Sequence, residues 1–346
     1  MWHSMQHLGK GGQICCLSNI SSLGRVVTTS SGRHLSPLLD QPLETNSRPS
    51  YSTAAADDNA KSSFGYCVSQ VRRYDQDNYV WMTQMPKHLR PGLFVVRAFN
   101  CETALVSDQV KSKEPALMQM RYQWWREAIG STFKGSPPTH PLTLALAEVL
   151  KSSTHLKKYN FTRLIDAREA DVLDTQPPLD VKALEVYAES TASQLLYMQL
   201  AAAGVVSREA DHAASHIGKA VGLATLLRGT AHHAAARRSY MPLDLCVQYG
   251  VSQEDIYSGN ASDGLRDVAL KVASIAKEHL EEGRSMGSKL PRLAKQVLLP
   301  AVAAHHYLTA LEKANFNLFE PSLLQGGASP LRHLMTIKYH MMFGTF

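Results

Sequence analysis

The amino-acid sequence predicts an all-α protein with one large helical domain. From about Val71 onward, apolar residues recur at the spacing of amphipathic helices, and strand-like alternation is nearly absent. The prolines fall at or near the ends of the predicted helices, as expected because Pro removes a backbone donor and clashes with the preceding turn. A chain of 346 residues that is 44% hydrophobic is long enough to bury a large core.

The predicted helices are bounded by Pro, Gly or capping residues and differ in length. They cover residues 88–109, 115–131, 141–155, 159–174, 180–203, 207–234, 262–286, 292–315 and 330–342. They share no repeated signature, which argues against a solenoid of stacked repeats. The helix over 207–234 is rich in Ala and Gly, so we expect its neighbours to approach it closely.

Residues 1–60 are predicted to be a mitochondrial transit peptide and disordered linker, which leaves the folded domain in residues 61–346. The first 39 residues contain Lys10, Arg25 and Arg33 but no Asp or Glu, and seven of them are serine. That composition is typical of an organellar presequence, which a membrane potential draws inward. A plain disordered tail is the alternative, and a plastid destination fits less well than a mitochondrial one.

The charge balance and the cysteines exclude several kinds of partner and site. The formal net charge of +6 suits anionic partners such as phosphate-bearing ligands or lipid headgroups. No run of Lys or Arg is long enough for a nucleic-acid-binding arm, so no nucleic-acid partner is expected. The most apolar window, residues 195–206, is too short to span a bilayer, so membrane contact would be peripheral. The five cysteines lack CxxC spacing and are expected to be free thiols.

One acidic segment could carry chemistry by itself. Residues 166–174 hold four carboxylates. On a helix Asp171 would lie about 60° and Asp166 about 80° from Asp174, so some of these carboxylates could converge on a cation. The alternative is a solvated helix face on which these carboxylates pair with Arg163 and Arg168, since charge runs usually face water.

A pair of histidines gives a second alternative. His212 and His216 are four residues apart and would share one helix face, the spacing found in zinc-binding helices. No Glu lies between them as a general base, and no third ligand is marked by spacing, so a metal-binding module is the weakest functional alternative. The sequence contains no Walker loop, G-x-G-x-x-G or G-x-S-x-G motif, which sets those enzyme classes aside.

Four segments resemble, in order and spacing, landmarks of the squalene/phytoene synthase family. They are RYQWWREAI at 121–129, LIDAREAD at 164–171, VYAESTASQL at 186–195 and IGKAVGLATLLRGTAHHAAARRSYMP at 217–242. The resemblance implies a single isoprenoid-synthase-like helical domain with a central cavity. In the enzymes, two aspartate-rich helical motifs hold Mg²⁺ on prenyl diphosphates, because Asp side chains at i and i+4 lie about 40° apart and can share a hard cation.

The metal-directed carboxylates of that pattern are largely missing here. The family's second motif, N-I-L-R-D-x-x-E-D-x-x-R-G-R-x-Y-L-P, aligns without a gap with residues 225–242. Gly229 and His233 stand at its metal-binding Asp positions. In the first motif, D-x-x-x-D falls on Ala104 and Asp108, so at most one ligand survives.

Other positions depart from the family's pattern in the same direction. Ser190 stands where the resemblance places a tyrosine implicated in squalene synthases. Gly229, His233 and Arg237 are spaced by four and are expected to form one helical stripe, so a face that is acidic in an active enzyme would be cationic here. The resemblance therefore implies a protein without a metal, a cofactor or catalysis.

Within the family, DHAASHIGKA at 211–220 and GVSQED at 250–255 resemble the branch of mitochondrial complex I assembly factors. That branch implies a pseudoenzyme on the matrix side of the inner membrane, in peripheral contact with it. It would act early in assembly of the membrane arm of NADH dehydrogenase. Its partners would be complex I subunits or assembly intermediates.

The cavity implied by the resemblance could bind a lipid, an isoprenoid or an apolar helix of a client subunit. The residues expected to contact such an occupant are Asp166, Asp171, Arg228, Arg237, Arg238 and Tyr240. The enzymatic alternative is a prenyl-diphosphate synthase with an atypical site that uses Asp108, Asp166 and Asp171.

Overall fold

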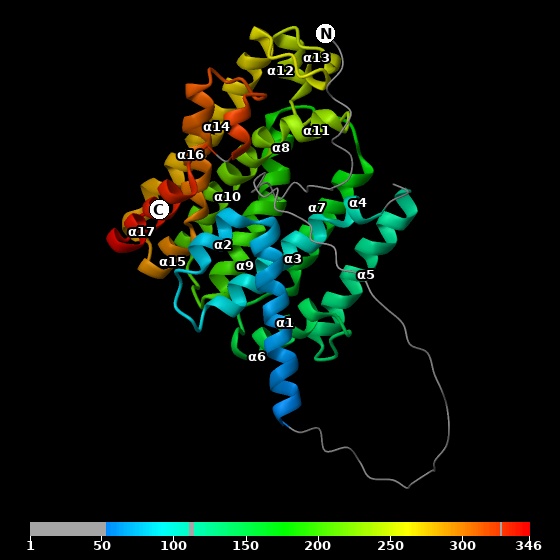
Figure 1. The fold of residues 1–346 in the computed structure, drawn as a ribbon, viewed down its shortest axis with the longest axis vertical. Helices are drawn as coiled ribbons and strands as arrows, with labels where there is room; N and C mark the ends of the chain where they lie inside the picture. The colour runs from blue at the N-terminus through cyan, green and yellow to red at the C-terminus, as the bar shows by residue number, and fades with distance from the viewer. Residues whose placement is uncertain (1–52, 111–113, 326) are drawn as a thin grey trace, which may run out of the picture.

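The computed structural model describes residues 53–110, 114–325 and 327–346, and most of these residues are helical (Figure 1). Within these ranges the regular structure consists of seventeen α-helices, one π-helix and two short 3₁₀ segments, with no strand. The predicted all-α class is therefore confirmed.

The α-helices are α1 Thr53–Tyr74, α2 Gln76–Met82, α3 Arg90–Ala104, α4 Val106–Gln109, α5 Pro115–Phe133, α6 Pro141–Ser152, α7 Lys158–Leu173, α8 Val181–Ala188, α9 Gln194–Ala202, α10 Arg208–Arg228, α11 Thr230–Ala235, α12 Leu243–Gln248, α13 Gln253–Tyr257, α14 Asp263–Ser285, α15 Arg292–Val297, α16 Pro300–Lys313 and α17 Pro330–Phe343. The π-helix Glu189–Ser193 joins α8 to α9, and the 3₁₀ segments are Met286–Lys289 and Pro321–Gln325.

Helix α1 is the longest element that the sequence prediction missed. It begins at Thr53, inside the segment predicted to be a linker, and packs against α3 and α6. Cys67 and Val71 on its inner face are fully buried. The domain boundary predicted at residue 61 therefore falls inside a helix. Residues 1–52, which hold most of the predicted transit peptide, lie outside the described residues.

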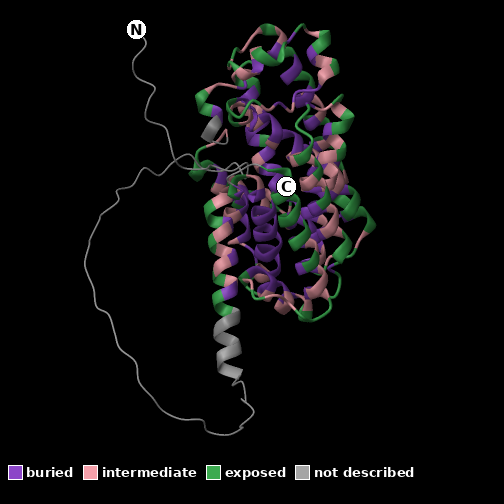
Figure 2. Cartoon of the chain, turned by 90° about the vertical axis from the view of Figure 1, so that its right-hand side faces the viewer, coloured by how far each residue is buried: buried purple, intermediate pink, exposed green. Residues whose placement is uncertain are grey.

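Helix α10 occupies the centre of the molecule and packs against α8, α9, α14, α16 and the π-helix. Two glycines permit this packing, as the Ala- and Gly-rich sequence predicts. A Cβ atom at Gly218 would overlap Ser193, and a Cβ atom at Gly222 would lie 2.5 Å from the Cβ of Ala188. Figure 2 shows the buried residues gathered in the interior between the helices, while exposed residues cover the outer turns.

The helix predicted over 207–234 is interrupted in the structure. Helix α10 ends at Arg228, and Gly229 separates it from α11. The backbone nevertheless keeps helical hydrogen bonds across the break, because the Gly229 amide donates to the Thr225 carbonyl at 2.9 Å and the His233 amide to the Gly229 carbonyl at 2.9 Å.

The helix predicted over 180–203 contains a π-helix where it crosses α10. Within this wider turn, the Thr191 hydroxyl donates to the Tyr187 carbonyl at 2.7 Å. The Ser193 hydroxyl donates to the Ser215 carbonyl of α10 at 3.1 Å. π-Bulges of this kind are rare and occur frequently at functional sites.

Three short helices, α2, α12 and α13, occupy segments without a predicted helix. Each has fewer than two turns, which is too short for apolar periodicity to mark it. Helix α13 begins with a capping box between Ser252 and Asp255. In the described ranges, no helix is both long and apolar enough to cross a membrane.

Candidate functional site

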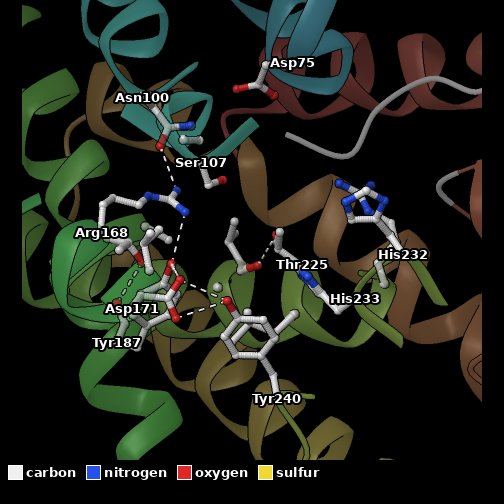
Figure 3. A pocket seen from close by; sticks show the side chains of 18 of the residues that line it. Asp75, Asn100, Ser107, Arg168, Asp171, Tyr187, Thr225, His232, His233 and Tyr240 are labelled. Atoms are coloured by element: carbon white, nitrogen blue, oxygen red, sulfur yellow. Dashed lines mark hydrogen bonds between the residues drawn. The ribbon is translucent and has the colours of Figure 1, made fainter. Parts of the chain in front are cut away.

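A cavity of about 470 Å³ lies beside the C-terminal part of α10. Its wall is formed by residues of α3, α4, α5, α7, α8, α9, α10, α11, α16 and the π-helix, together with residues at the α1–α2 junction and after α11. Figure 3 shows Asp75, Asn100 and Ser107 on one side of the cavity, with Asp171 and Tyr240 on the other. The wall combines apolar side chains with several arginines and aspartates, so a ligand here would meet both kinds of surface.

Asp171 on α7 is the centre of a hydrogen-bond network in this wall (Figure 3). Its carboxylate accepts hydrogen bonds from Nη2 of Arg238 at 2.8 Å and from the Tyr240 hydroxyl at 2.9 Å. The Tyr187 hydroxyl donates to the same carboxylate at 3.3 Å. Burial raises the pKa of Asp171, while Arg238, Arg168 and the two hydroxyl donors act to lower it. The protein's own donors therefore occupy this carboxylate.

Arg168 extends the network to α3. Its guanidinium donates to the Tyr187 hydroxyl at 3.0 Å and to the side-chain carbonyl of Asn100 at 3.2 Å. The rings of Tyr187 and Tyr240 stack with their centroids 6.3 Å apart. These contacts join α3, α7, α8 and the segment after α11 into one side of the cavity.

A buried ion pair lies at the α1–α2 junction, where Asp75 accepts from Nε of Arg97 at 2.8 Å. The two side chains are 8% and 9% exposed. Asn78 donates to Asp75 at 2.7 Å and accepts from Nε1 of Trp81 at 2.9 Å, so α2 is held against α3. Because breaking a buried pair leaves an uncompensated charge, this network fixes the position of the cavity wall.

Arg228, the last residue of α10, donates to Asp77 at 3.0 Å. Its Nε atom and the hydroxyl of Tyr307 on α16 are buried and have no hydrogen-bond partner among the residues that the structure describes. Both residues line the cavity. Buried polar atoms normally form at least one hydrogen bond. A ligand oxygen placed beside these two donors would therefore accept hydrogen bonds that the protein itself leaves unmade.

Three of the five motif positions compared with the family line the cavity: Ala104, Asp108 and His233. Gly229 instead terminates α10 and lies outside the wall. Ser190 lies in the π-helix, also outside the wall, and its hydroxyl accepts a hydrogen bond of 3.5 Å from Arg163. The alignment therefore locates the first motif and His233 at the cavity, but not Ser190 or Gly229.

The continuous cationic stripe predicted for Gly229, His233 and Arg237 does not form. Burial, with the nearby charges of His232 and two arginines, lowers the pKa of His233 to about 3, so its imidazole is neutral at pH 7. Arg237 lies beyond α11 with a φ of 53° and pairs with Glu254 at 2.8 Å. It still borders the cavity, but its charge is directed to α13.

The residues predicted to contact an occupant are placed as follows. The cavity is lined by Asp171, Arg228, Arg237, Arg238 and Tyr240. Asp166 lies outside the wall on the outer face of α7, where its side chain is 55% exposed and accepts from Arg126 at 2.7 Å. Arg126 of α5 also pairs with Glu169. The acidic segment thus has a solvated face, on which Asp166 and Glu169 pair with Arg126.

The residues at the family's metal positions do not fit Mg²⁺, which prefers carboxylate oxygens in octahedral geometry. Among these positions Asp108 alone offers a carboxylate, Ala104 and Gly229 have no side-chain ligand atom, and His233 offers a nitrogen. The carboxylate of Asp171, elsewhere in the wall, is occupied by Arg238. Across the part of the chain that the structure describes, no group of three or more His, Cys, Asp or Glu side chains is arranged to hold a metal ion.

His212 and His216 belong to a chain of imidazoles between α10 and α14. Nδ1 of His216 lies 3.0 Å from Nδ1 of His279, and Nε2 of His279 lies 2.6 Å from Oε1 of Glu185. A neutral imidazole carries one donor and one acceptor nitrogen, so a shared proton accounts for the contact between the two rings. The histidines thus join α8, α10 and α14.

Several wall residues were missed by the sequence analysis. The largest group comes from the α1–α2 junction and α3, and consists of Asp75, Asp77, Asn78, Arg97 and Asn100. The sequence signal that could have indicated these wall residues was the acidic pair Asp75 and Asp77 in YDQDNY at 74–79, because polar residues at a helix junction can point into a cavity. No spacing in the sequence links that junction to α7, which follows it by about ninety residues.

Comparisons with known proteins agree with the fold and with the motifs. The family model for squalene/phytoene synthase matches residues 71–332. The chain is 40% identical over 260 residues to the Rattus norvegicus protein named NADH dehydrogenase (ubiquinone) complex I, assembly factor 6. That alignment covers 75% of this chain and 77% of the rat protein. The Drosophila melanogaster homolog of that assembly factor is 34% identical over 323 residues, covering 89% and 91% of the two chains.

The crystal structure of a dehydrosqualene synthase in complex with ligand superposes on the chain with a TM-score of 0.70. The alignment covers 83% of this chain and 99% of that chain at 20% sequence identity, so it shows a shared helical fold. The family model and the relatives above 30% identity show the family as well. The chain belongs to the squalene/phytoene synthase family.

Proposed function

We propose that this protein is a non-catalytic assembly factor for respiratory complex I that acts early in assembly of the membrane arm. It works in mitochondria, in peripheral contact with the matrix side of the inner membrane. The observation that carries the proposal is a retained synthase-type cavity whose metal positions hold Ala104, Gly229 and His233. The names of the relatives at 40% and 34% identity support the link to complex I.

The charges of the cavity support the loss of catalysis. Asp171 pairs with Arg238, Asp77 with Arg228, and Asp75 with Arg97. A metal ion that recruited any of these carboxylates would leave an arginine without its partner in a partly or fully buried place, which is unfavourable. These three carboxylates are therefore already engaged in ion pairs within the protein and are poorly suited to binding Mg²⁺.

The cavity itself supports a second part of the proposal, that it holds a lipid, an isoprenoid or an apolar helix of a client subunit. Its apolar wall suits hydrocarbon. The two buried donors, Nε of Arg228 and the Tyr307 hydroxyl, suit a carbonyl or hydroxyl oxygen of the occupant.

The decisive experiment for the assembly role is deletion of the gene followed by measurement of assembled complex I on native gels. We expect complex I to fall, and wild-type protein to restore it. Asp108→Asn, which removes the last carboxylate of the first family motif, should restore it equally, because no catalytic step depends on that group. Normal complex I after deletion would contradict the assembly role.

A direct assay addresses the enzymatic alternative, a prenyl-diphosphate synthase with an atypical site. Purified protein is incubated with farnesyl or geranylgeranyl diphosphate and Mg²⁺, and released pyrophosphate is measured. We expect no release above a protein-free blank. Turnover that is lost in Asp108→Asn but kept in Asp166→Asn would establish the enzymatic alternative, because Asp108 lines the cavity and Asp166 does not.

A further inference from the structure

Helix α17 carries an exposed apolar stripe. Its members are between 55% and 70% exposed, and they are Leu331, Met335, Tyr339, Met342 and Phe343. At 100° per residue these positions fall within an arc of about 120°. The opposite side of the helix buries His333 and Ile337, where α17 packs against α16 and α2. The α17 stripe is thus an amphipathic face turned away from the core.

The charge on this helix is entirely positive. Arg332 and Lys338 are exposed, and α17 contains no Asp or Glu. On the helical wheel Arg332 lies inside the arc of the α17 stripe and Lys338 at its edge. At the far end, Arg292 donates to the Met341 carbonyl at 3.0 Å, which adds a third cation beside the helix.

The positive field extends from α17 to α16. The pKa of His305 is lowered by burial and then by Arg284, Lys277 and Arg332. The pKa of His340 is lowered by burial and by Arg284 and His305. Arg284, Lys277 and Arg332 thus lie close enough to His305 to disfavour its charged form, so cations also lie on the α16 side of the α17 stripe.

An apolar face bordered by cations fits the surface of an anionic bilayer. Interfacial helices bury apolar side chains at the boundary between headgroups and acyl chains, while Lys and Arg contact anionic lipid headgroups. A helix of 14 residues is about 21 Å long, too short to cross a bilayer but long enough to lie along one. The aromatic rings of Tyr339 and Phe343, with centroids 4.5 Å apart, suit the interfacial region.

We propose that α17 is the membrane-docking surface of this protein and that its stripe enters a bilayer containing anionic phospholipid. The inference rests on the peripheral membrane contact in the proposed function, and it specifies which helix makes that contact. Arg332 and Lys338 contact headgroup phosphates, and the five apolar side chains lie below them.

Helix α5 offers a matched control. Leu117, Met120 and Trp124 are also exposed, at 41%, 66% and 37%. Unlike the α17 stripe, this group is accompanied by the exposed carboxylate of Glu127 on the same helix. Figure 1 shows α5 and α17 at opposite edges of the molecule in that view. One bilayer surface that meets α17 is therefore not expected to meet α5.

The experiment measures co-sedimentation of the purified full chain with phosphatidylcholine vesicles, with and without cardiolipin. The double variant Met335→Glu/Met342→Glu should partition at least about tenfold less onto cardiolipin-containing vesicles, because it loses two inserted side chains and adds two repelled charges. The control Leu117→Glu/Met120→Glu adds the same charges on α5 and should change partitioning by less than about twofold. Residues 1–52 are identical in all variants, so their contribution cancels in the comparison.

A third variant keeps the apolar stripe and removes only charge. Arg332→Gln/Lys338→Gln should lose most of the preference for cardiolipin while its circular dichroism and Tm stay those of the wild type. Because both positions are exposed, this variant keeps the test valid if a glutamate variant misfolds. Equal binding by wild type and both α17 variants would overturn the inference.

Two other outcomes would also overturn it. If the wild-type protein binds neither kind of vesicle, the α17 stripe is not a membrane-docking surface, and a protein partner is its expected occupant. A wild-type dimer that the glutamate variant converts to a monomer in light scattering would assign the stripe to a second copy of the chain. Because the vesicle assay contains no complex I, its failure would leave the assembly role standing, and only the gene-deletion result bears on that role.

Discussion

Asp171 on α7 accepts a hydrogen bond of 2.8 Å from Nη2 of Arg238, a residue that follows it by sixty-seven positions. The two side chains are 15% and 21% exposed. The same guanidinium group also contacts the Asp171 carbonyl oxygen. This pair fastens the segment after α11 to α7, so a carboxylate in a synthase-type cavity here serves to hold two segments of the wall together.

The pair can be tested by removing the charge of Asp171. Asp171→Asn should lower the free energy of unfolding by about 1–3 kcal/mol, because Arg238 then stays partly buried without its counter-charge. Asp166→Asn, on the exposed face of the same helix, should lower it by less than about 0.5 kcal/mol. Urea unfolding followed by circular dichroism measures both. Equal losses would show that the network around Asp171 adds nothing to stability.

Replacing glycine by alanine should have opposite effects on stability at a closely packed position in α10 and at an open position in α1. Gly218→Ala should destabilise the protein by about 2–3 kcal/mol, because its Cβ would overlap Ser193 of the π-helix. Gly65→Ala in α1 should be neutral or stabilising by up to about 1 kcal/mol, since no atom lies within 4 Å of the added Cβ and Ala is the better helix former. Thermal unfolding of the two variants checks the sign of each effect.

These packing contacts show what the sequence could and could not predict about the fold. The Ala and Gly content of 207–234 was sufficient to predict a closely packed helix, because small residues are needed wherever helices approach. It did not predict the break at Gly229 or the π-helix opposite Gly218, because both depend on which helix crosses α10 and where. Helix α1 was missed because TAAADDNAKSS has few large apolar residues, although α1 buries Cys67 and Val71 farther along.

Buried histidines make stability depend on pH. The unfolded chain protonates His233 near its ordinary pKa of 6.5, whereas the folded chain does so only near 3, because burial disfavours the charged ring. Between these values the unfolded state binds more protons, so the free energy of unfolding falls as the pH is lowered through that range, with a slope of up to about 1.4 kcal/mol per pH unit for each proton. The pKa of His306, lowered to about 4 mainly by burial, acts in the same direction.

Urea unfolding at pH 7 and pH 5 measures this dependence. His233→Gln should reduce the loss of stability between the two pH values. Part of the loss should remain, because His306 is unchanged in this variant. His155→Gln, at an exposed position outside the cavity wall, serves as the control and should leave the loss unchanged. A wild-type protein that is equally stable at both pH values would contradict the assignment of a neutral, partly buried His233.

The absence of a suitable ligand set predicts indifference to Mg²⁺. A ligand that binds only the folded state raises Tm in proportion to RT ln(1 + [L]/Kd). Millimolar MgCl₂ should therefore shift Tm no more than NaCl of the same ionic strength, with or without farnesyl diphosphate. A rise of several degrees that is specific to Mg²⁺ plus diphosphate would show that the described cavity still assembles a metal site.

The cavity was only partly predictable. Asp171, Arg238 and Tyr240 could be placed near one another because the family resemblance aligns their segments with helices that face a common cavity. Asp166 was placed wrongly beside them, since spacing alone cannot decide which face of α7 is turned inward, and the structure pairs it with Arg126 outside. The direction of the Arg237 side chain was also unpredictable, because it depends on the left-handed backbone conformation of Arg237 itself.

The internally paired charges of the wall also determine the thermodynamic signature of any occupant. A ligand that competes for Arg238 must first separate it from Asp171, so its net electrostatic gain is small. Most of the gain then comes from apolar side chains such as Met118, Leu195 and Val221, which also line the cavity. Binding of that kind shows weak dependence on ionic strength and a negative change in heat capacity, as calorimetry at several temperatures records. The wall described here would in this way select hydrocarbon over phosphate.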